Sequence, residues 1–505
     1  MKKQQLKASL FAGLAVLALV SCGQGGGESG ASASSGGYSG KIKTIYIDGG
    51  GDIGDYNTTA SMTKSESNPF PYNTLKTLCE EWETSHPGYE VKINKTSAHG
   101  DRSILEGQLK MHTACHIIYQ NGNVINSDLG KDYYVDLTDY LNSPNPYLEN
   151  NAAWKTVYNE SELASTQASD GSYYYVNLEK IPVCFMYNKT LLKKAGIDVD
   201  NMKVDTLNDL CNVMASFQSW QNKQSATEGY GTYSTLYTWY QLALETNMFS
   251  DLVESCDVLR QNGMVDTEEL CRAYKKGIFT PEAVEGNRYY ELLRLIQKLD
   301  TYKESASYAC AQSWSAGKLA FMEATGSHLR TYSAADLDFE WGTFCFPDIS
   351  LEDYSGKSLK GVVRGIATLA TSWWVTNTAV DDDTVAQCVD LLQFLTAPAQ
   401  NNRLVGDLGG GIPLNPDSST QMADYLKPLV NQYNADLAEG GRQVWSAFSP
   451  SAVLNINFQN SFIRTMQEMD AGTKTLDEAA STLVKQMKAM IASTIIENGY
   501  DETAW

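Results

Sequence analysis

Residues 173–198 read YYYVNLEKIPVCFMYNKTLLKKAGID and decide the fold class. Inside this stretch, residues 180–187 are too apolar for a strand with one face in water, and residues 361–370 share that composition. Strands that are apolar on both faces are typical of the interior of a parallel sheet covered by helices. We therefore expect two interior parallel strands, at 180–187 and at 361–370.

The first folded segment indicates the same architecture. Residues 41–47 alternate between polar and apolar, which predicts a strand, and apolar residues spaced three to four apart over 75–82 predict a helix. A break at 87–88, Pro-Gly, then precedes a second predicted strand at 89–93. A strand, a helix and a strand in this order predict an α/β fold with a parallel sheet.

Two later helices have readable N-termini. Thr206 stands three residues before Asp209, and Thr475 and Glu478 form a capping box; an apolar pattern with helical spacing follows each threonine. In a capping box each of the two side chains bonds the backbone N–H of the other residue. We expect helices to begin directly after Thr206 and Thr475.

The first 22 residues predict where the protein works. A lysine-rich start and an apolar run over 10–20 are typical of a secretory signal, and the run is too short to span a bilayer. We therefore expect residues 1–21 to be a signal peptide. Cys22 follows the expected cut and matches the lipobox of bacterial lipoproteins, a resemblance that implies acylation of Cys22; a chance cysteine after an ordinary signal is the alternative. Residues 22–40, rich in Gly, Ser and Ala, predict a flexible, lipid-anchored tether on the extracytoplasmic face of the cell membrane.

Size and charge limit the possible architectures and partners. Roughly 480 residues remain after the signal, too many for one core and enough for two lobes. The formal net charge is −21, and the signal carries three lysines and no acidic residue, so the mature chain is near −24. Such a surface repels nucleic acid and anionic lipid headgroups. We expect no nucleic-acid partner.

Cysteine usage does not predict a disulfide framework. With Cys22 lipidated, nine cysteines remain, an odd number without a CxxC pair. Several lie in apolar runs, where free cysteine behaves as a small hydrophobe. We expect mostly reduced thiols.

Six motifs, in order along residues 41–500, resemble those of one protein family. They are VDLTDYL (135–141), the stretch 173–198, WSAGKLAFMEATGSHLR (314–330), CVDLLQFLTAP (388–398), GGGIPLNP (409–416) and MDAGTKTLDEAA (469–480). The chain resembles the extracellular solute-binding proteins of ABC sugar importers, in the family 1 branch that includes maltose-binding protein. Three residues depart from the pattern: Trp314 replaces Phe, His328 replaces a Trp that faces the sugar in many members, and His116 replaces Asp.

The resemblance implies a two-lobed, periplasmic-binding-protein-like α/β fold. Each lobe would be a mainly parallel sheet flanked by helices, and hinge strands would join the lobes. The first lobe would hold residues 41–180 and 366–420, and the second residues 181–365 and 421–505. Chain order places crossings between the lobes near 178–183, near 363–370 and between 413 and 426.

The implied function is that of a substrate-binding lipoprotein that captures an extracellular carbohydrate, an oligosaccharide, between two lobes. It would deliver the sugar to the transmembrane subunits of an ABC permease, as a monomer without catalysis or cofactor. A surface-anchored glycosidase, which needs a carboxylate pair, is one alternative. A binding protein for a non-sugar solute and an adhesin or sensor subunit on the same fold are the others.

Aromatic residues dominate the chemistry expected of the cleft. They gather in residues 229–241 and at 373–374, and flat rings suit the C–H face of a pyranose. Asp52 and Asn121 would bond hydroxyls, while His328 would offer a shorter plane with a polar edge. The replacement of the family's Trp by His328 suggests a ligand that uses one stacking surface fewer and one hydrogen bond more than a maltodextrin does. The alternative is that the aromatics belong to the core. The expected ligand-binding residues are Asp52, Asn121, Tyr237, Trp239, His328 and Trp373.

Three other groups of residues give weaker indications of a metal or nucleotide site. His112 and His116 have a spacing that could ligate zinc on a helix, but no third ligand completes the set. Residues 198–205 resemble a calcium loop without its glycine. The glycines at 49–51 precede no Gly-Lys-Ser/Thr, so a nucleotide-binding loop is not expected. We expect no metal site.

Overall fold

A computed structural model describes residues 40–49, 58, 61–65, 71–94, 102–120, 122–235, 238–305, 309–349, 366–415, 422–439, 447–454 and 456–505. The expected signal peptide, Cys22 and the tether up to residue 39 lie outside the described residues. Among the helices of the described part, none is both long and apolar enough to cross a membrane.

The strands of the sheet position the site. They are β1 (Lys43–Asp48), β2 (Tyr89–Asn94), β3 (Ile117–Tyr119), β4 (Tyr175–Asn188), β5 (Gly231–Ser234), β6 (Leu319–Thr325), β7 (Trp341–Cys345), β8 (Ile366–Val375) and β9 (Ile412–Pro413). Hydrogen bonding orders them β2-β1-β3-β8-β4-β6-β5, and β7 and β9 also pair with β4.

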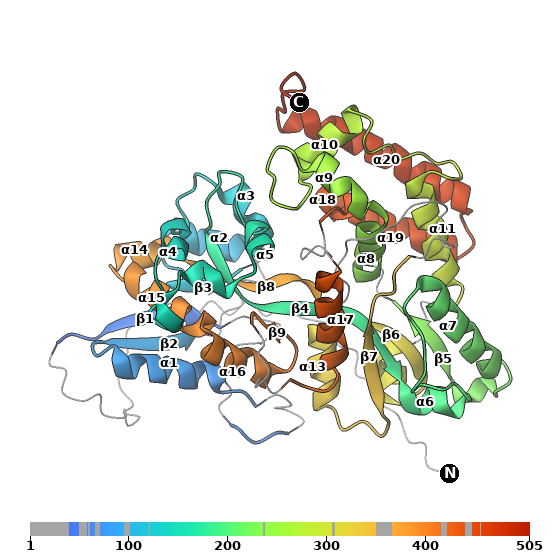
Figure 1. Ribbon diagram of the computed structural model, residues 1–505, viewed down its shortest axis with the longest axis horizontal. Helices are drawn as coiled ribbons and strands as arrows, with labels where there is room; N and C mark the ends of the chain where they lie inside the picture. Colours follow the sequence, from blue (N-terminus) through green and yellow to red (C-terminus); the bar gives the residue numbers. More distant parts are fainter. Residues whose placement is uncertain are drawn as a thin grey trace, which may run out of the picture. The chain divides into compact units, whose positions relative to one another are not determined.

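The α-helices either flank these strands or pack on other helices (Figure 1). They are α1 (Thr74–Ser85), α2 (Arg102–Lys110), α3 (Ile125–Asp128), α4 (Thr138–Asn142), α5 (Glu160–Ala164), α6 (Lys189–Lys194), α7 (Leu207–Gln221), α8 (Thr238–Phe249), α9 (Val253–Cys256), α10 (Thr267–Lys275), α11 (Arg288–Asp300), α12 (Cys310–Ser315), α13 (Gly326–Ala334), α14 (Asn377–Asp381), α15 (Val385–Thr396), α16 (Pro398–Leu408), α17 (Lys427–Ala438), α18 (Pro450–Leu454), α19 (Ile456–Asp470) and α20 (Leu476–Glu497).

Both predicted helix starts are confirmed. In α7 the Thr206 hydroxyl accepts the Asp209 N–H at 3.1 Å, and the Asp209 carboxylate accepts the Thr206 N–H at 3.0 Å. Thr475 and Glu478 make the same reciprocal pair ahead of α20. These bonds satisfy backbone donors that have no partner inside the helix, so the sequence alone locates the helix ends.

The sheet is mixed rather than mainly parallel. β1 runs parallel to β2, as the strand-helix-strand pattern predicts, and it also runs parallel to β3. β5 runs parallel to β6. The prediction that 180–187 and 361–370 are parallel strands is wrong, because β4 and β8 run antiparallel to each other and to their other neighbours. An apolar composition reports burial on both faces, and burial does not fix strand direction.

Strand β4 changes neighbours halfway along its length. Residues up to Pro182 pair with β8 and β9, and residues from Val183 onward pair with β6 and β7 (Figure 1). The register shifts between Ile181 and Pro182. Proline has no N–H to donate to a ladder, and an irregularity there bends the strand. The change of neighbours falls within the crossing predicted at 178–183.

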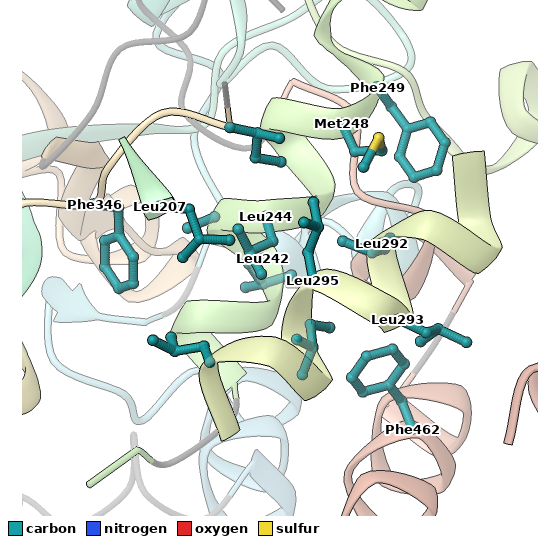
Figure 2. Close-up of a cluster of buried hydrophobic side chains, with 14 of the residues drawn as sticks. Leu207, Leu242, Leu244, Met248, Phe249, Leu292, Leu293, Leu295, Phe346 and Phe462 are labelled. Carbon is teal, nitrogen blue, oxygen red and sulfur yellow. The ribbon is translucent and has the colours of Figure 1, made fainter. Parts of the chain in front are cut away.

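Buried side chains form separate cores on the two halves of β4. The first core gathers residues of β1, α1, β8, α15 and α16 around Val176 and Leu178 of β4. The second core surrounds Val183 and Phe185 and is built mostly from helices. Figure 2 shows part of the second core, where leucines of α8 face leucines of α11 and Leu293 of α11 lies next to Phe462 of α19. The nine cysteines of the described residues are all free thiols, as expected.

Candidate functional site

A cavity of about 310 Å³ lies beside the point where β4 changes neighbours. We call it the cleft cavity. Its walls come from the end of β3, from β4 and β8, from the junction of β6 with α13, and from the turn between α16 and β9. The lining residues are Tyr119, Glu179, Ile181, Thr325, Gly326, Ser327, His328, Arg330, Thr371, Leu408, Gly410 and Gly411.

Glu179 and Thr371 face this cavity from the two neighbouring strands. The Thr371 hydroxyl donates to the Glu179 carboxylate, and only 6% of each residue is exposed. Thr371 has a φ of 57°, which a β-branched residue adopts rarely and at a cost of about 1–3 kcal/mol. Such outliers cluster at functional sites, where the surrounding structure holds them in place.

Three glycines let the cavity walls approach closely. A Cβ on Gly411 would lie 1.7 Å from Glu179 Oε2, and a Cβ on Gly326 would lie 2.2 Å from the Gly410 carbonyl oxygen. A Cβ on Gly410 would in turn lie 2.9 Å from the Gly326 carbonyl oxygen. Only residues without a side chain permit this contact between the α16–β9 turn and the start of α13.

His328 takes part in the N-terminal cap of α13. Its Nδ1 accepts the Thr325 backbone N–H at 3.3 Å and lies 3.1 Å from Thr325 Oγ1, and Thr325 caps the N3 backbone in return. Burial lowers the pKa of His328 from its usual 6.5. The accepted N–H assigns the hydrogen of the neutral ring to Nε2, which makes that nitrogen a donor.

The structure places the predicted site residues in different surroundings. His328 lines the cleft cavity. Trp373 does not: it is 0% exposed and packs in the first core, because β8 is an interior strand with both faces covered. Asp52, Asn121 and Tyr237 lie outside the described residues, as does the side chain of Trp239, whose backbone belongs to α8.

Several lining residues were not predicted. Glu179 and Lys180 form a charged pair inside an otherwise apolar strand, which is a usable signal for a functional strand position. Arg330 follows His328 by two residues, and Tyr119 precedes Asn121 by two, so a wider window around the predicted residues includes both. Thr371 carries no sequence signal, since its backbone conformation depends on the fold.

Lys180, directly after Glu179, takes part in a buried polar cluster. Its Nζ lies 2.9 Å from Glu162 Oε2 and 3.2 Å from the Tyr433 hydroxyl, and that hydroxyl donates to Glu162 Oε1 at 2.6 Å. The three residues are 2–6% exposed. They come from α5, β4 and α17, so this cluster joins three segments at the strand that crosses between the cores.

The two histidines with zinc-like spacing contact different carboxylates. His112 Nδ1 lies 2.6 Å from Asp381 Oδ2, whereas His116 Nε2 lies 2.9 Å from Asp382 Oδ2. His116 Nδ1 also accepts the Tyr46 N–H at 2.9 Å. Within the described residues, no three His, Cys, Asp or Glu side chains are grouped so as to hold a metal ion.

Comparison with known proteins extends these observations. A family model for bacterial extracellular solute-binding proteins matches residues 77–432. A comparison with curated proteins finds no match. A solved periplasmic solute binding protein from Pectobacterium atrosepticum is 17% identical with a TM-score of 0.59, over 90% of this chain and 100% of that chain.

Several solved structures with this fold carry a ligand in their description, two of them as follows. An ABC substrate-binding protein from Listeria monocytogenes, in complex with cycloalternan, is 13% identical with a TM-score of 0.55, over 89% of this chain and 98% of that one. The GacH receptor of Streptomyces glaucescens, solved unliganded and with acarbose, is 14% identical with a TM-score of 0.56 and the same coverage.

The likeness to these structures establishes a two-lobed, periplasmic-binding-protein-like fold built on a mixed sheet flanked by helices. The match to the family model is a separate finding and spans well over half of the sequence. The chain belongs to the family of bacterial extracellular solute-binding proteins.

Proposed function

We propose that this protein is the substrate-binding lipoprotein of an ABC importer and captures a carbohydrate in the cleft cavity. The observation that carries the proposal is the cavity's place beside the point where β4 passes from one core to the other, because two-lobed α/β proteins bind their ligands between the lobes. The solved proteins with the same fold include one described with cycloalternan and one with acarbose, both carbohydrates.

The chemistry of the lining suits hydroxyl groups. A neutral His328 donates from Nε2, Arg330 donates from its guanidinium, and Glu179 accepts through its carboxylate. Sugar hydroxyls both donate and accept, so they can pair with all three side chains. Tyr119 adds an aromatic ring to the wall.

The finer parts of the proposal concern delivery and lobe boundaries. The first lobe holds residues 41–180 and 366–420, the second holds residues 181–365 and 421–505, and they close around the ligand. The monomer is anchored through acylated Cys22 and hands its sugar to the permease subunits. Asp52, Asn121, Tyr237 and Trp239 stay proposed ligand contacts.

A thermal-shift screen tests the function. A ligand that binds only the native state stabilises it by RT ln(1 + [L]/Kd), about 2.7 kcal/mol at a hundredfold excess over Kd. We expect malto-, xylo- or other plant oligosaccharides to raise Tm without being consumed. A response confined to peptides or polyamines would identify a non-sugar solute, and hydrolysis of the sugar would favour the glycosidase alternative.

A further inference from the structure

Two further hollows lie beside the cleft cavity along helix α13. A middle hollow of about 490 Å³ shares Arg330 and Leu408 with the cleft cavity. An outer hollow of about 390 Å³ shares Ser333 and Tyr425 with the middle hollow. Each hollow therefore borders the next.

Helix α13 forms one side of this path. Gly326, Arg330 and Ser333 are four and three residues apart, so they share one face of the helix. Gly326 lines the cleft cavity, and Arg330 lines both the cleft cavity and the middle hollow. Ser333 lines both the middle hollow and the outer hollow. From residue 326 to residue 334 the helix rises about 12 Å.

The outer hollow has an aromatic wall. Trp341 at the start of β7 stacks on Tyr425, with ring centroids 5.0 Å apart and planes at 30°. Tyr187 and Phe339 add two more rings, and all four side chains are half-buried. The Tyr425 hydroxyl donates to the Gly409 carbonyl at 2.7 Å, which ties this wall to the turn that also forms the cleft cavity.

A glycine shapes the same wall. A Cβ on Gly342 would lie 2.7 Å from Lys189 Cε and 2.8 Å from Tyr187 Cε1, so these two side chains can lie across β7 only because residue 342 has none. The hollow also holds Lys189, Asp336 and Asp424. Charges of both signs next to apolar rings suit an uncharged, hydroxyl-rich chain better than a polyanion.

We propose that the ligand is an oligosaccharide too long for the cleft cavity alone, and that its outer residues lie along α13 and stack at Trp341 and Tyr425. This inference rests on the proposed function. It adds a second sugar-binding region on the outer side of α13. Affinity should therefore grow with chain length beyond what the cleft cavity holds.

The test measures Kd by calorimetry for maltose to maltohexaose and xylobiose to xylohexaose. In the ladder that binds, we expect the hexasaccharide to bind more tightly than the disaccharide. Trp341→Ala should weaken hexasaccharide binding about 2- to 12-fold through lost stacking and leave the disaccharide unchanged. Trp341→Phe should restore most of the loss.

Two further variants separate stacking from folding. Ser333 is exposed, so Ser333→Trp should block the path without disturbing the core and should remove the same length-dependent gain. Trp220 of α7 is a matched control: it is also half-buried and packs on a tyrosine, Tyr230, at 5.1 Å, yet it lines none of the three hollows. Trp220→Ala should bind both lengths like the wild type.

The outcomes distinguish the outer sugar-binding region from the proposed function on which it rests. Two results would refute the outer sugar-binding region without refuting sugar capture. One is equal affinity for disaccharide and hexasaccharide, and the other is an equal loss of affinity for both sugars in Trp341→Ala. Failure of every member of both ladders to bind, together with no response to any oligosaccharide in the thermal-shift screen, would overturn both proposals.

Discussion

The buried cluster of Lys180, Glu162 and Tyr433 makes a sharp prediction about stability. Replacing Glu162 with Gln removes the negative charge but keeps an oxygen that can accept the Tyr433 hydroxyl, which donates to Glu162 at 2.6 Å. Lys180 then remains buried at 6% exposure without its carboxylate partner. Removing one member of a buried ion pair costs about 3–5 kcal/mol, because the other charge is left uncompensated.

The expected effect is measurable as a lower melting temperature. At about 2.1 cal/mol/K per residue, the unfolding entropy of a unit as long as Lys41–Trp505 is about 1 kcal/mol/K, so Tm should fall by about 3–5 °C. The measurement is calorimetric melting at neutral pH. The double variant Glu162→Gln with Lys180→Met should recover most of the loss, since it removes both charges.

The chain offers a matched control on its surface. Arg403 makes two bonds of 2.9 Å to Glu81, and both side chains are nearly half exposed. Glu81→Gln should cost about 0–1 kcal/mol, the range for exposed ion pairs. If Glu162→Gln melts within the range of Glu81→Gln, or if the double variant is no better than the single one, the reasoning from burial is refuted.

Three further outcomes are expected. Because burial lowers the folded pKa of His328, its contribution to stability is present above pH 6.5 and is lost as pH falls through the folded pKa. His328→Gln, which does not titrate but can still cap α13, should flatten that part of a Tm–pH profile, and an unchanged profile would contradict the lowered pKa of the buried imidazole. Trp373→Ala should lower the free energy of unfolding by about 3–5 kcal/mol in denaturant melts while the folded protein keeps its ligand affinity; weakened affinity with unchanged stability would return Trp373 to the binding site. Cys22→Ala should release the folded protein from membranes in a fractionation assay, and retention after a salt wash would refute lipid anchoring.

Local chemistry explains which predictions held. Thr206 and Asp209, and likewise Thr475 and Glu478, satisfy each other across three residues, so the chain segment itself contains both partners of the cap. The pattern over 41–47 and 75–93 likewise holds strand, helix and strand within one short stretch, and β1 and β2 are parallel as expected. The family motifs belong to the same class of signal, because each is a short run of residues.

Burial and strand direction depended on partners far away in sequence. Trp373 is predicted to line the cleft because it follows a crossing, yet it belongs to the core because β3 and β4 flank its strand and the first core encloses it. The apolar composition of β4 predicts a parallel strand, yet its neighbours run antiparallel to it.

The sequence by itself determined the family, the α/β class, the local helix ends and the candidacy of His328. Only the tertiary structure decided that Glu179 meets Thr371, 192 residues along the chain, and that Lys180 meets Tyr433 across 253 residues. A helix cap is stabilised by groups three residues apart, whereas a cavity is assembled by strands and turns that meet only after folding. For that reason the fold was readable from motifs, and most of the described cavity wall was not.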